Sequence, residues 1–537
     1  MFKKFIFIFV ILVIVLIFLS TKNLSFELVK NLEIFYSLVA EVERNYVDDI
    51  DVSELIRKSI DEMLLSLDPY TNFISEAQIE EFKLMTTSHY GGIGAIIQQT
   101  DTGIIITNLF FDSPAHKVGL KPGDIIVEVN NKKIKGLKID EVRDLMKGSP
   151  NTKVKIKIFR PYYNKYLTFN LIRESIKIPC VPYYTIIDNN IGYIILTEFT
   201  ENSYKEFLKA FKELKSKGIT SLIIDLRNNP GGLLLEAVNI ASIFFKRNTL
   251  ITYTKGRQPE YNVNYLTIYE PLDTLIPIVF LVNKNSASAS ELLTGAFQDY
   301  DRAVLVGDTT FGKGLVQSTI NLPFNSILKI TTAKYYTPLG RPIHSKTYSD
   351  KLLLKTYKTK KGRSFHESKG LIPDIVLSLS DTASFIYSLI RKNLFFEYAN
   401  KFYYENPTID TANFIVDEKI FQGFKSFVDS FGFSYESNSE KTLNFLINSL
   451  KKENYYDNLC EELKNIELKI QKIKEIDWQL YKEQIKYLLT KEILSRYICE
   501  KAYFIYKDFF LNIDKQLDTS IKILKDINLY YKILSKK

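Results

Sequence analysis

Three short segments of this chain combine small residues with side chains that could do chemistry. They are RNNPGG (Arg227 to Gly232), NSASASE (Asn285 to Glu291) and GDTTFGKG (Gly307 to Gly314), and each follows an apolar run typical of a buried strand. Ligands of open α/β sheets bind outside the carboxyl ends of the strands, so we expect the three segments to meet at one sheet edge. Together they would bring a hydroxyl, an amine and backbone N–H groups to one site.

The serine segment lies between the apolar run PIVFLVN and the helix-like run ELLTGAFQDY. A serine at such a strand-to-helix turn lies at the positive end of the helix, which favours a nucleophile whose reaction develops an oxyanion. The same alternation of serine and alanine is expected where a helix packs tightly on a strand, with Ser286 or Ser290 capping the helix. The residues alone leave the choice among Ser286, Ser288 and Ser290 open.

The segment GDTTFGKG offers a rival interpretation as a phosphate-binding loop. Gly307, Gly312 and Lys313 fit the pattern G-x-x-x-x-G-K after an apolar strand. However, Gly314 stands where Ser or Thr would hold Mg²⁺, and the β-branched run LVQSTINLP that follows predicts no helix to face the phosphates. The pattern therefore disfavours a nucleotide site and, taken alone, indicates a glycine turn with a solvated lysine.

The elements around these segments predict an α/β sheet. Residues 190 to 345 alternate near-continuous apolar strands with amphipathic helices, which is typical of a buried, largely parallel sheet with helices on its faces. Residues 26 to 88 look helical, residues from 90 onward are β-rich with one helix-like piece, IDEVRDLMKG, and the chain after Val376 is helical again.

The β-rich part resembles a PDZ domain. The resemblance rests on DSPAHKVGLKPGD (residues 112 to 124) leading into DIIVEVNNKKI. The segment GGIG stands where that family keeps its carboxylate-binding loop. The resemblance therefore implies that backbone N–H groups of Gly91, Gly92, Ile93 and Gly94 bind the terminal carboxylate of a peptide.

Taken together, the motifs resemble the C-terminal processing proteases, a serine peptidase family with a Ser/Lys active site. The resemblance runs from about Leu55 to Val376 and includes SLDPYTNFI, DLRNNPGG, the serine segment, TFGKGLVQ, AKYYTPLGRPIH and KGLIPDIV. It implies that Ser288 is the nucleophile, Lys313 the general base and Gln317 a residue that orients the lysine.

These roles set physical requirements. The N–H of Ala289 and one from the Asn-Pro-Gly-Gly turn, Gly232 or alternatively Gly231, are the candidate oxyanion donors. A lysine base must be neutral, yet with an ordinary pKa only about 0.04% of lysine is neutral at pH 7. Burial of Lys313 would have to lower that pKa.

Composition excludes several other functions. The net charge of +9 is spread along the chain as Lys, with no motif for nucleic acid. Four histidines show no metal-ligand spacing, so we expect no metal or other cofactor. Cys180, Cys460 and Cys499 are widely spaced and are expected to be buried or idle thiols.

The N-terminus predicts export. Lys3 and Lys4 precede fifteen apolar residues, Phe5 to Leu19, and no small-residue cleavage pattern follows. We expect an uncleaved anchor slightly more than a removed signal, with the rest of the chain outside the cytoplasm, on the periplasmic side of the cell envelope.

The overall prediction is a multidomain α/β protein that acts as an exported serine endopeptidase. Its expected partners are the membrane, protein substrates with free, apolar C-termini and a second copy bound through helical regions. The alternative is a catalytically silent PDZ scaffold that binds tails of envelope proteins. The basic segment 351 to 370 is expected to be a solvated loop. The expected parts are an anchor (1–21), an N-terminal helical region (26–88), a PDZ-like domain (89–175), a Ser/Lys protease core (176–376) and a helical C-terminal extension (377–537).

Overall fold

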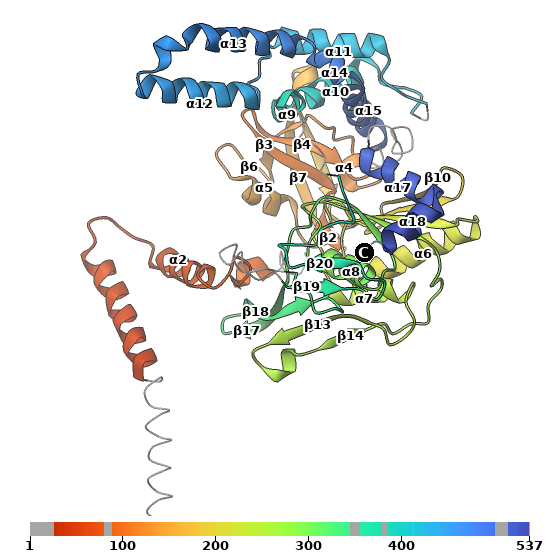
Figure 1. Cartoon of the computed structure of the whole chain (residues 1–537). Helices are drawn as coiled ribbons and strands as arrows, with labels where there is room; N and C mark the ends of the chain where they lie inside the picture. Colours follow the sequence, from red (N-terminus) through yellow and green to blue (C-terminus); the bar gives the residue numbers. More distant parts are fainter. Residues whose placement is uncertain are drawn as a thin grey trace, which may run out of the picture. The chain divides into compact units, whose positions relative to one another are not determined.

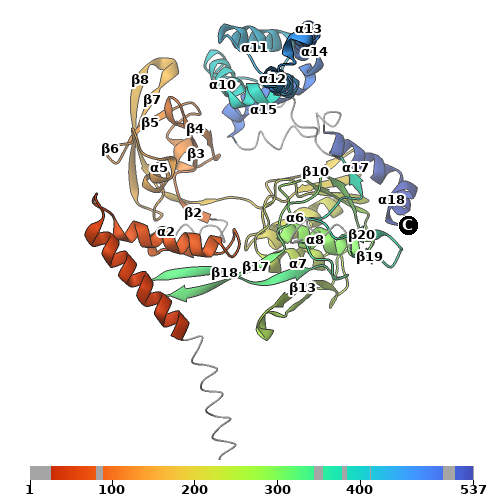
Figure 2. The ribbon, with the colours of Figure 1, turned by 60° about the vertical axis from the view of Figure 1, so that its left-hand side comes forward.

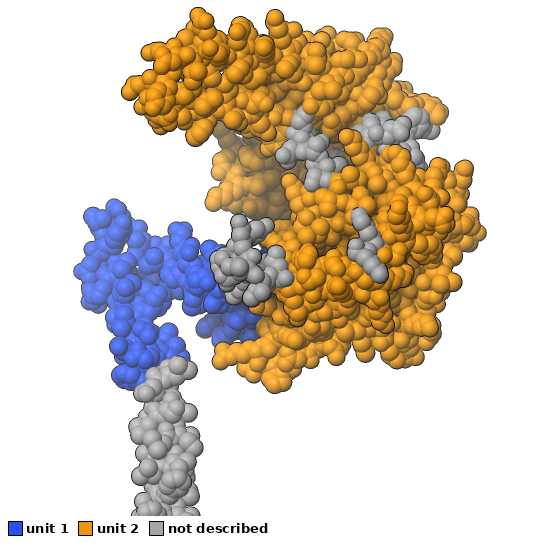
Figure 3. Space-filling model, viewed as in Figure 1, with its two compact units in different colours: residues 1–79, 317–331 blue, residues 80–316, 332–537 orange. Residues whose placement is uncertain are grey.

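The computed structural model describes residues 26–79, 89–343, 355–377, 384–411, 413–499 and 514–535. The chain divides into two compact units. One holds residues 1–79 and 317–331, and the other holds residues 80–316 and 332–537 (Figure 3). Both helices and sheets are substantial, which confirms the predicted multidomain α/β class.

The smaller unit is not helical throughout. A helix over residues 26–45 precedes α2 (Val52–Leu65), whose first turn is capped by the Asp51 carboxylate. Strand β1 (Asn72–Ile74) then pairs with residues 327–329 of β18 (Ser326–Tyr336). The prediction of a helical region over 26–88 is therefore wrong at β1, because the partner of that strand lies far along the chain and leaves no local periodicity. The 3-10 turn η1 (Glu76–Gln78) follows β1, and β17 (Leu315–Leu322) also pairs with β18.

The predicted anchor, residues 1–21, lies outside the described residues. Within the ranges that are described, no helix combines the length and apolar character needed to cross a membrane.

The PDZ-like part contains an antiparallel sheet and two short helices. Its strand order is β3-β4-β5-β7-β8, and β6 pairs with β5. A separate pair, β2 with β9, joins the start of this part to its end (Figure 1). The predicted helix-like piece IDEVRDLMKG is α5. The elements are β2 (His89–Gly92), β3 (Ala95–Thr100), β4 (Gly103–Leu109), α4 (Pro114–Lys117), β5 (Ile125–Val129), β6 (Lys132–Lys133), α5 (Ile139–Met146), β7 (Lys153–Arg160), β8 (Lys165–Ile172) and β9 (Glu174–Lys177).

The central sheet of the larger unit confirms the predicted parallel arrangement. Its strand order is β10-β11-β12-β15-β16-β21; every pair from β11 to β21 is parallel and only β10 runs antiparallel. Helices α6, α7 and α8 pack their apolar side chains on one face of it. The elements are β10 (Tyr183–Ile187), β11 (Ile191–Ile195), α6 (Ser203–Ser216), β12 (Ser221–Asp225), α7 (Leu234–Ser242), β15 (Ile278–Val282), α8 (Ala289–Asp299), β16 (Val304–Gly307) and β21 (Ile375–Val376).

The other face of this sheet is covered by the far C-terminal part of the chain. Helices α17 (Lys515–Lys525) and α18 (Ile527–Leu534) lie beside the strands in both ribbon views (Figures 1 and 2). Leu517, Ile521 and Tyr530 of these helices share one buried cluster with Tyr193 and Val279 of the sheet. A parallel sheet needs apolar cover on both faces, so this helix pair completes the core.

In the sequence, residues 384–499 come between β21 and α17 and form a helical region within the predicted extension, residues 377–537. Its core is aromatic and includes Phe385, Phe424 and Trp478. The Lys121 amine of the PDZ-like part donates to the Tyr403 hydroxyl of α10. The helices are α9 (Ser384–Arg391), α10 (Leu394–Glu405), α11 (Glu418–Ser430), α12 (Asn438–Lys452), α13 (Cys460–Glu475), α14 (Asp477–Leu480) and α15 (Lys482–Ile498).

The basic segment 351–370 is not the solvated loop that its charge predicts. Its described residues form a hairpin of β19 (Thr356–Lys358) and β20 (Ser364–His366). Arg363 is buried, with ion pairs of 2.7 Å to Asp301 and 2.7 Å to Asp374. These two carboxylates bring a basic residue into the interior. A second pair of strands, β13 (Leu250–Gly256) and β14 (Asn264–Leu266), lies between α7 and β15 in the chain.

Candidate active site

The three segments singled out from the sequence follow three neighbouring parallel strands. β15 lies between β12 and β16, with Asp225 opposite Leu281 and Val282 opposite Gly307. Their carboxyl ends therefore share one edge of the sheet, as predicted. Hydrogen bonds also join the segments, because Ala287 N–H donates to the Asn229 carbonyl at 3.0 Å and Phe311 N–H donates to the Ser286 carbonyl at 3.0 Å.

The backbone distinguishes Ser288 from its two neighbouring serines. Ser288 has φ 54° and ψ −116° and immediately precedes α8, so the chain turns sharply there from strand to helix. Ser288 is half-buried, whereas Ser286 and Ser290 are fully buried. The Ser286 hydroxyl donates to the Leu226 carbonyl at 2.8 Å, and the Ser290 hydroxyl to the Asn229 carbonyl at 3.1 Å. A non-glycine residue at this φ is a strained conformation typical of functional turns.

Glu291 joins the serine segment to the lysine segment. One of its carboxylate oxygens accepts the N–H of Ser288 and the N–H of Lys313, each at 2.9 Å. The other accepts the Thr310 hydroxyl at 2.5 Å and the Gly312 N–H at 2.8 Å. Burial raises the pKa of the Glu291 carboxyl, and these hydrogen bonds act in the opposite direction. The sequence does not predict this role, because the spacing of residues does not show which backbone groups a carboxylate will reach.

The lysine segment is a loop between two strands. Gly307 ends β16, residues 308–314 are irregular, and β17 begins at Leu315. No helix follows the loop, which confirms that the phosphate-loop pattern is not accompanied by the structure it requires. Lys313 is half-buried.

The Asn-Pro-Gly-Gly turn lies directly against Ser288. A side-chain carbon added to Gly231 would be 2.7 Å from the Ser288 Cβ and 2.9 Å from the Ala289 nitrogen. The Gly231 N–H already donates to the Asn229 Oδ1 at 2.9 Å. Within the described residues, the Gly232 N–H meets no acceptor, and neither does that of Ala289, the first residue of α8. The geometry therefore favours Gly232 over Gly231 as an oxyanion donor beside Ala289.

Gln317 belongs to the smaller unit. It lies on β17, four positions after Lys313, and its side-chain amide donates to the Thr331 hydroxyl at 3.4 Å. Its expected role in orienting the lysine stays a prediction.

The GGIG loop connects β2 to β3. Gly91 and Gly92 are the last residues of β2, and Gly94 has φ +74°. The carbonyl of Ile93 accepts the Ala115 N–H at 2.9 Å, and the carbonyl of Gly94 accepts the Phe110 N–H at 2.9 Å. After the loop, β3 is the edge strand of its sheet and α5 packs beside it. An edge strand next to a helix is the arrangement to which a peptide can add as a further strand.

Among the described residues, no three His, Cys, Asp or Glu side chains lie where they could share a metal ion. Within the described part of the chain, Cys180, Cys460 and Cys499 form no disulfide, and Cys180 and Cys499 are buried.

Comparison with known protein families gives three matches along the chain. Residues 190–377 match the model "Peptidase family S41", residues 112–160 match "PDZ domain", and residues 385–524 match "Probable PDZ-protease, C-terminal helical domain".

Individual relatives agree with these matches. A "Carboxy-terminal-processing protease" of Bartonella bacilliformis is 34% identical over 318 residues, which cover 58% of this chain and 73% of that protein. A "Probable CtpA-like serine protease" of Staphylococcus epidermidis is 34% identical over 349 residues, covering 64% of this chain and 68% of the relative. Among solved structures, the photosystem II D1 C-terminal processing protease is 27% identical, with a TM-score of 0.37, and the match covers 64% of this chain and 92% of that one.

Proposed function

The chain belongs to the carboxy-terminal processing proteases of peptidase family S41, and on that premise we propose that Ser288 is its nucleophile and Lys313 its general base. It is a serine-type peptidase with a PDZ domain. The observation that carries the assignment is the Ser288 backbone, which turns at φ 54° directly before α8 while the neighbouring serines are buried. This conformation presents a hydroxyl at the sheet edge, above the amino end of a helix.

The proposed reaction proceeds through an acyl-enzyme. The Ser288 Oγ attacks the scissile carbonyl and its proton passes to the neutral Lys313 amine. The resulting oxyanion accepts the N–H groups of Ala289 and Gly232. Lys313 then returns the proton to the leaving amine, and later takes one from the water that hydrolyses the ester. Gln317 orients the lysine side chain in this proposal.

Substrate capture is assigned to the PDZ domain. The N–H groups of the GGIG loop would receive a free carboxylate, and the peptide would pair with β3. Ile97 of β3 and Val142 and Leu145 of α5 belong to the apolar core of this domain, which favours a final side chain that is apolar.

We also propose that the protein is exported and held at the membrane by residues 2–21. The proposal rests on the two lysines and fifteen apolar residues at the start of the sequence. Extraction of cell membranes with carbonate would release a cleaved form and retain an anchored one. A second copy bound through the helical regions stays a prediction, and sedimentation analysis of the purified protein would measure it.

Labelling with a fluorophosphonate tests the catalytic assignment. The full chain should be labelled and should hydrolyse casein, and Ser288→Ala should abolish both. Ser286→Ala and Ser290→Ala are the matched controls and should keep the label. Lys313→Arg keeps the charge but cannot deprotonate at working pH, so it should also be inactive, whereas exposed Lys284→Arg should be active. If the wild-type chain is not labelled, the alternative of a catalytically silent PDZ scaffold would hold. If Lys313→Arg is active, Lys313 is not the base.

A further inference from the structure

The guanidinium of Arg227 is held from both sides at the start of the oxyanion turn. Arg227 follows β12 by two positions. Its Nε donates to the Asp225 carboxylate at 3.0 Å and one terminal nitrogen donates to the same carboxylate at 2.7 Å. The Tyr193 hydroxyl donates to this carboxylate too, at 2.6 Å. These contacts all come from the strands of the sheet.

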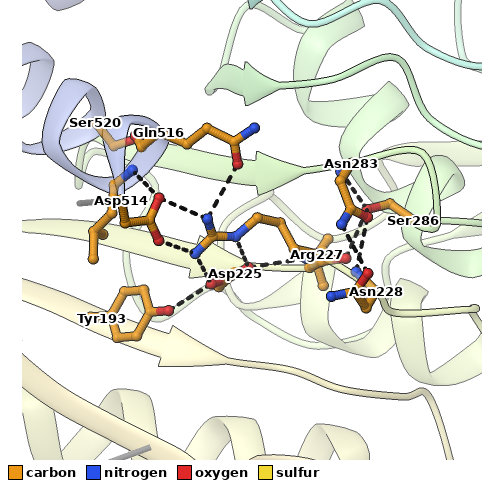
Figure 4. Close-up of polar contacts among 11 residues, drawn as sticks. Tyr193, Asp225, Arg227, Asn228, Asn283, Ser286, Asp514, Gln516 and Ser520 are labelled. Carbon is orange, nitrogen blue, oxygen red and sulfur yellow. Dashed lines mark hydrogen bonds and ion pairs between the residues drawn. The ribbon is translucent and has the colours of Figure 1, made fainter. Parts of the chain in front are cut away.

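The second side comes from the C-terminal helix pair. Asp514, which caps α17, accepts a hydrogen bond from one terminal nitrogen of Arg227 at 2.9 Å and forms an ion pair with the other at 2.8 Å (Figure 4). Gln516 accepts a further one at 3.2 Å, and its own amide donates to the Leu377 carbonyl at 2.6 Å. The guanidinium of Arg227 thus has partners both in the sheet and at a helix nearly three hundred positions later in the chain.

Arg227 lies in the backbone segment that leads to Gly232. On one side of Arg227, the Leu226 carbonyl accepts the Ser286 hydroxyl. On the other side, the Asn228 N–H donates to the Asn283 side chain at 3.0 Å. Four positions after Arg227, Gly231 lies against the Ser288 Cβ. A shift of Arg227 would therefore displace the turn that lies against Ser288.

The two carboxylates also keep Arg227 charged in a buried place. Burial alone would lower the pKa of its guanidinium, but Asp225 and Asp514 hold it well above its usual value. Hydrogen bonds between charged groups are short and strongly directional, so each carboxylate fixes the plane of the guanidinium. Without Asp514, one terminal nitrogen keeps only the longer hydrogen bond to Gln516 and the other keeps only Asp225.

We propose that Asp514 is a positioning residue for catalysis, which holds Arg227 from the second face of the sheet and so fixes the oxyanion turn against Ser288. The proposal rests on the proposed function, because it assumes that the Gly232 N–H serves the reaction at Ser288. It gives the C-terminal segment a part in the chemistry of a site whose other residues all lie between positions 225 and 317.

The test compares two Asp→Asn variants of the full chain on one helix. Asp514→Asn should lower kcat for peptide hydrolysis by about tenfold or more and leave KM unchanged, because a misplaced oxyanion donor affects the transition state alone. Binding of a peptide aldehyde, which forms a tetrahedral adduct with the serine, should weaken by a similar factor. Asp518→Asn removes the same charge from α17, where Asp518 pairs with Lys522 rather than Arg227, and should match wild type. Asp514→Glu, which restores a carboxylate, should recover part of kcat.

The outcomes separate this inference from the proposed function. A wild-type chain that is labelled at Ser288, together with a folded Asp514→Asn variant of normal kcat, would overturn the role of Asp514 alone. A wild-type chain without label would overturn the proposed function itself. Equal losses in Asp514→Asn and Asp518→Asn would show a general effect of helix charge and would also exclude the role. If Asp514→Asn does not fold, Gln516→Ala removes a single hydrogen bond to the same guanidinium; it should lower kcat severalfold at constant KM, and an unchanged kcat would contradict the proposal.

Discussion

Glu291 shows how one residue can set the geometry of two loops. Its carboxylate is fully buried and accepts backbone N–H groups from both the serine and the lysine segments. Its four donors are the N–H groups of Ser288, Gly312 and Lys313 and the Thr310 hydroxyl. An ionised carboxylate has acceptor positions for all four. An amide does not, because its NH₂ group would face an N–H or a hydroxyl whichever way it is turned.

We therefore expect Glu291→Gln to lower kcat about 100-fold, because the two loops would shift by a fraction of an ångström or more. The raised pKa adds a second signature. The folded chain binds this proton more tightly than the unfolded chain, so the free energy of unfolding should fall as the pH rises from 4.5 through the folded-state pKa. Glu291→Gln cannot ionise and should lack that component in urea unfolding curves measured across this range.

Glu397→Gln is the matched control for Glu291→Gln. Burial also raises the pKa of Glu397, which lies on α10 outside the sheet edge. This variant should lose a similar pH-dependent component of stability and keep normal kcat. An unchanged kcat in Glu291→Gln would mean that the loops are held without the carboxylate.

At the residue scale, the sequence predicts the kind of chemistry but not which serine performs it. Motif resemblance selects Ser288, whereas the residues alone leave three serines open. The distinction lies in a backbone angle and in the hydroxyl partners of Ser286 and Ser290, and neither is visible in spacing. Glu291 stands in the same segment, yet its partners are backbone atoms that become neighbours only in the folded chain.

At the scale of elements, the proposed binding site for a substrate tail lies at the edge strand β3, beside the helix α5. The GGIG loop precedes β3, and side chains of β3 and α5 belong to the apolar core of this domain. Affinity should then depend on a terminal negative charge and an apolar last side chain. Each hydrogen bond to a charged group contributes roughly 1.5 to 3 kcal/mol, so loss of the carboxylate should weaken capture at least tenfold.

The prediction is that amidation of a substrate tail slows its cleavage at least tenfold at subsaturating substrate. One polypeptide that ends in Val would be compared with its amidated twin and with a version that ends in Asp, and both changed tails should be cut slowly. At saturating substrate the differences should shrink, because capture is no longer limiting. Equal rates for all three tails would assign the PDZ domain to another task.

The sheet itself was largely predictable, because its strands are apolar runs between amphipathic helices. The pairing of β1 with β18 was not, since strand partners far apart in the chain leave no local pattern. The cover of the second sheet face was also missed. Strands that are apolar on both faces predict a layer of helices on each face of the sheet. The helices within residues 190–345 cover only one of these faces.

At the scale of the whole molecule, α17 and α18 contribute to the stability of the protease core. The Tyr530 hydroxyl accepts the Ile278 N–H at 3.1 Å and donates to the Arg302 carbonyl at 3.1 Å. Both partners lie in or beside the central sheet. Removal of this hydroxyl would leave two buried backbone groups without their partner.

Tyr530→Phe should therefore lower the free energy of unfolding by about 1–3 kcal/mol. The neighbouring Tyr531 is half exposed, at 50%, and Tyr531→Phe should change stability by less than about 0.5 kcal/mol. Denaturant unfolding of the full chain measures both. Equal effects would indicate that the helix pair rests only loosely on the sheet.

The position of this helix pair in the chain has a consequence for biosynthesis. A ribosome makes the sheet, the nucleophile and the lysine loop long before it makes residues 514–534. Until those residues emerge, one face of the sheet stays uncovered and Arg227 lacks its outer carboxylate. The nascent chain would therefore reach full activity only after residues 514–534 have been made and have packed on the sheet.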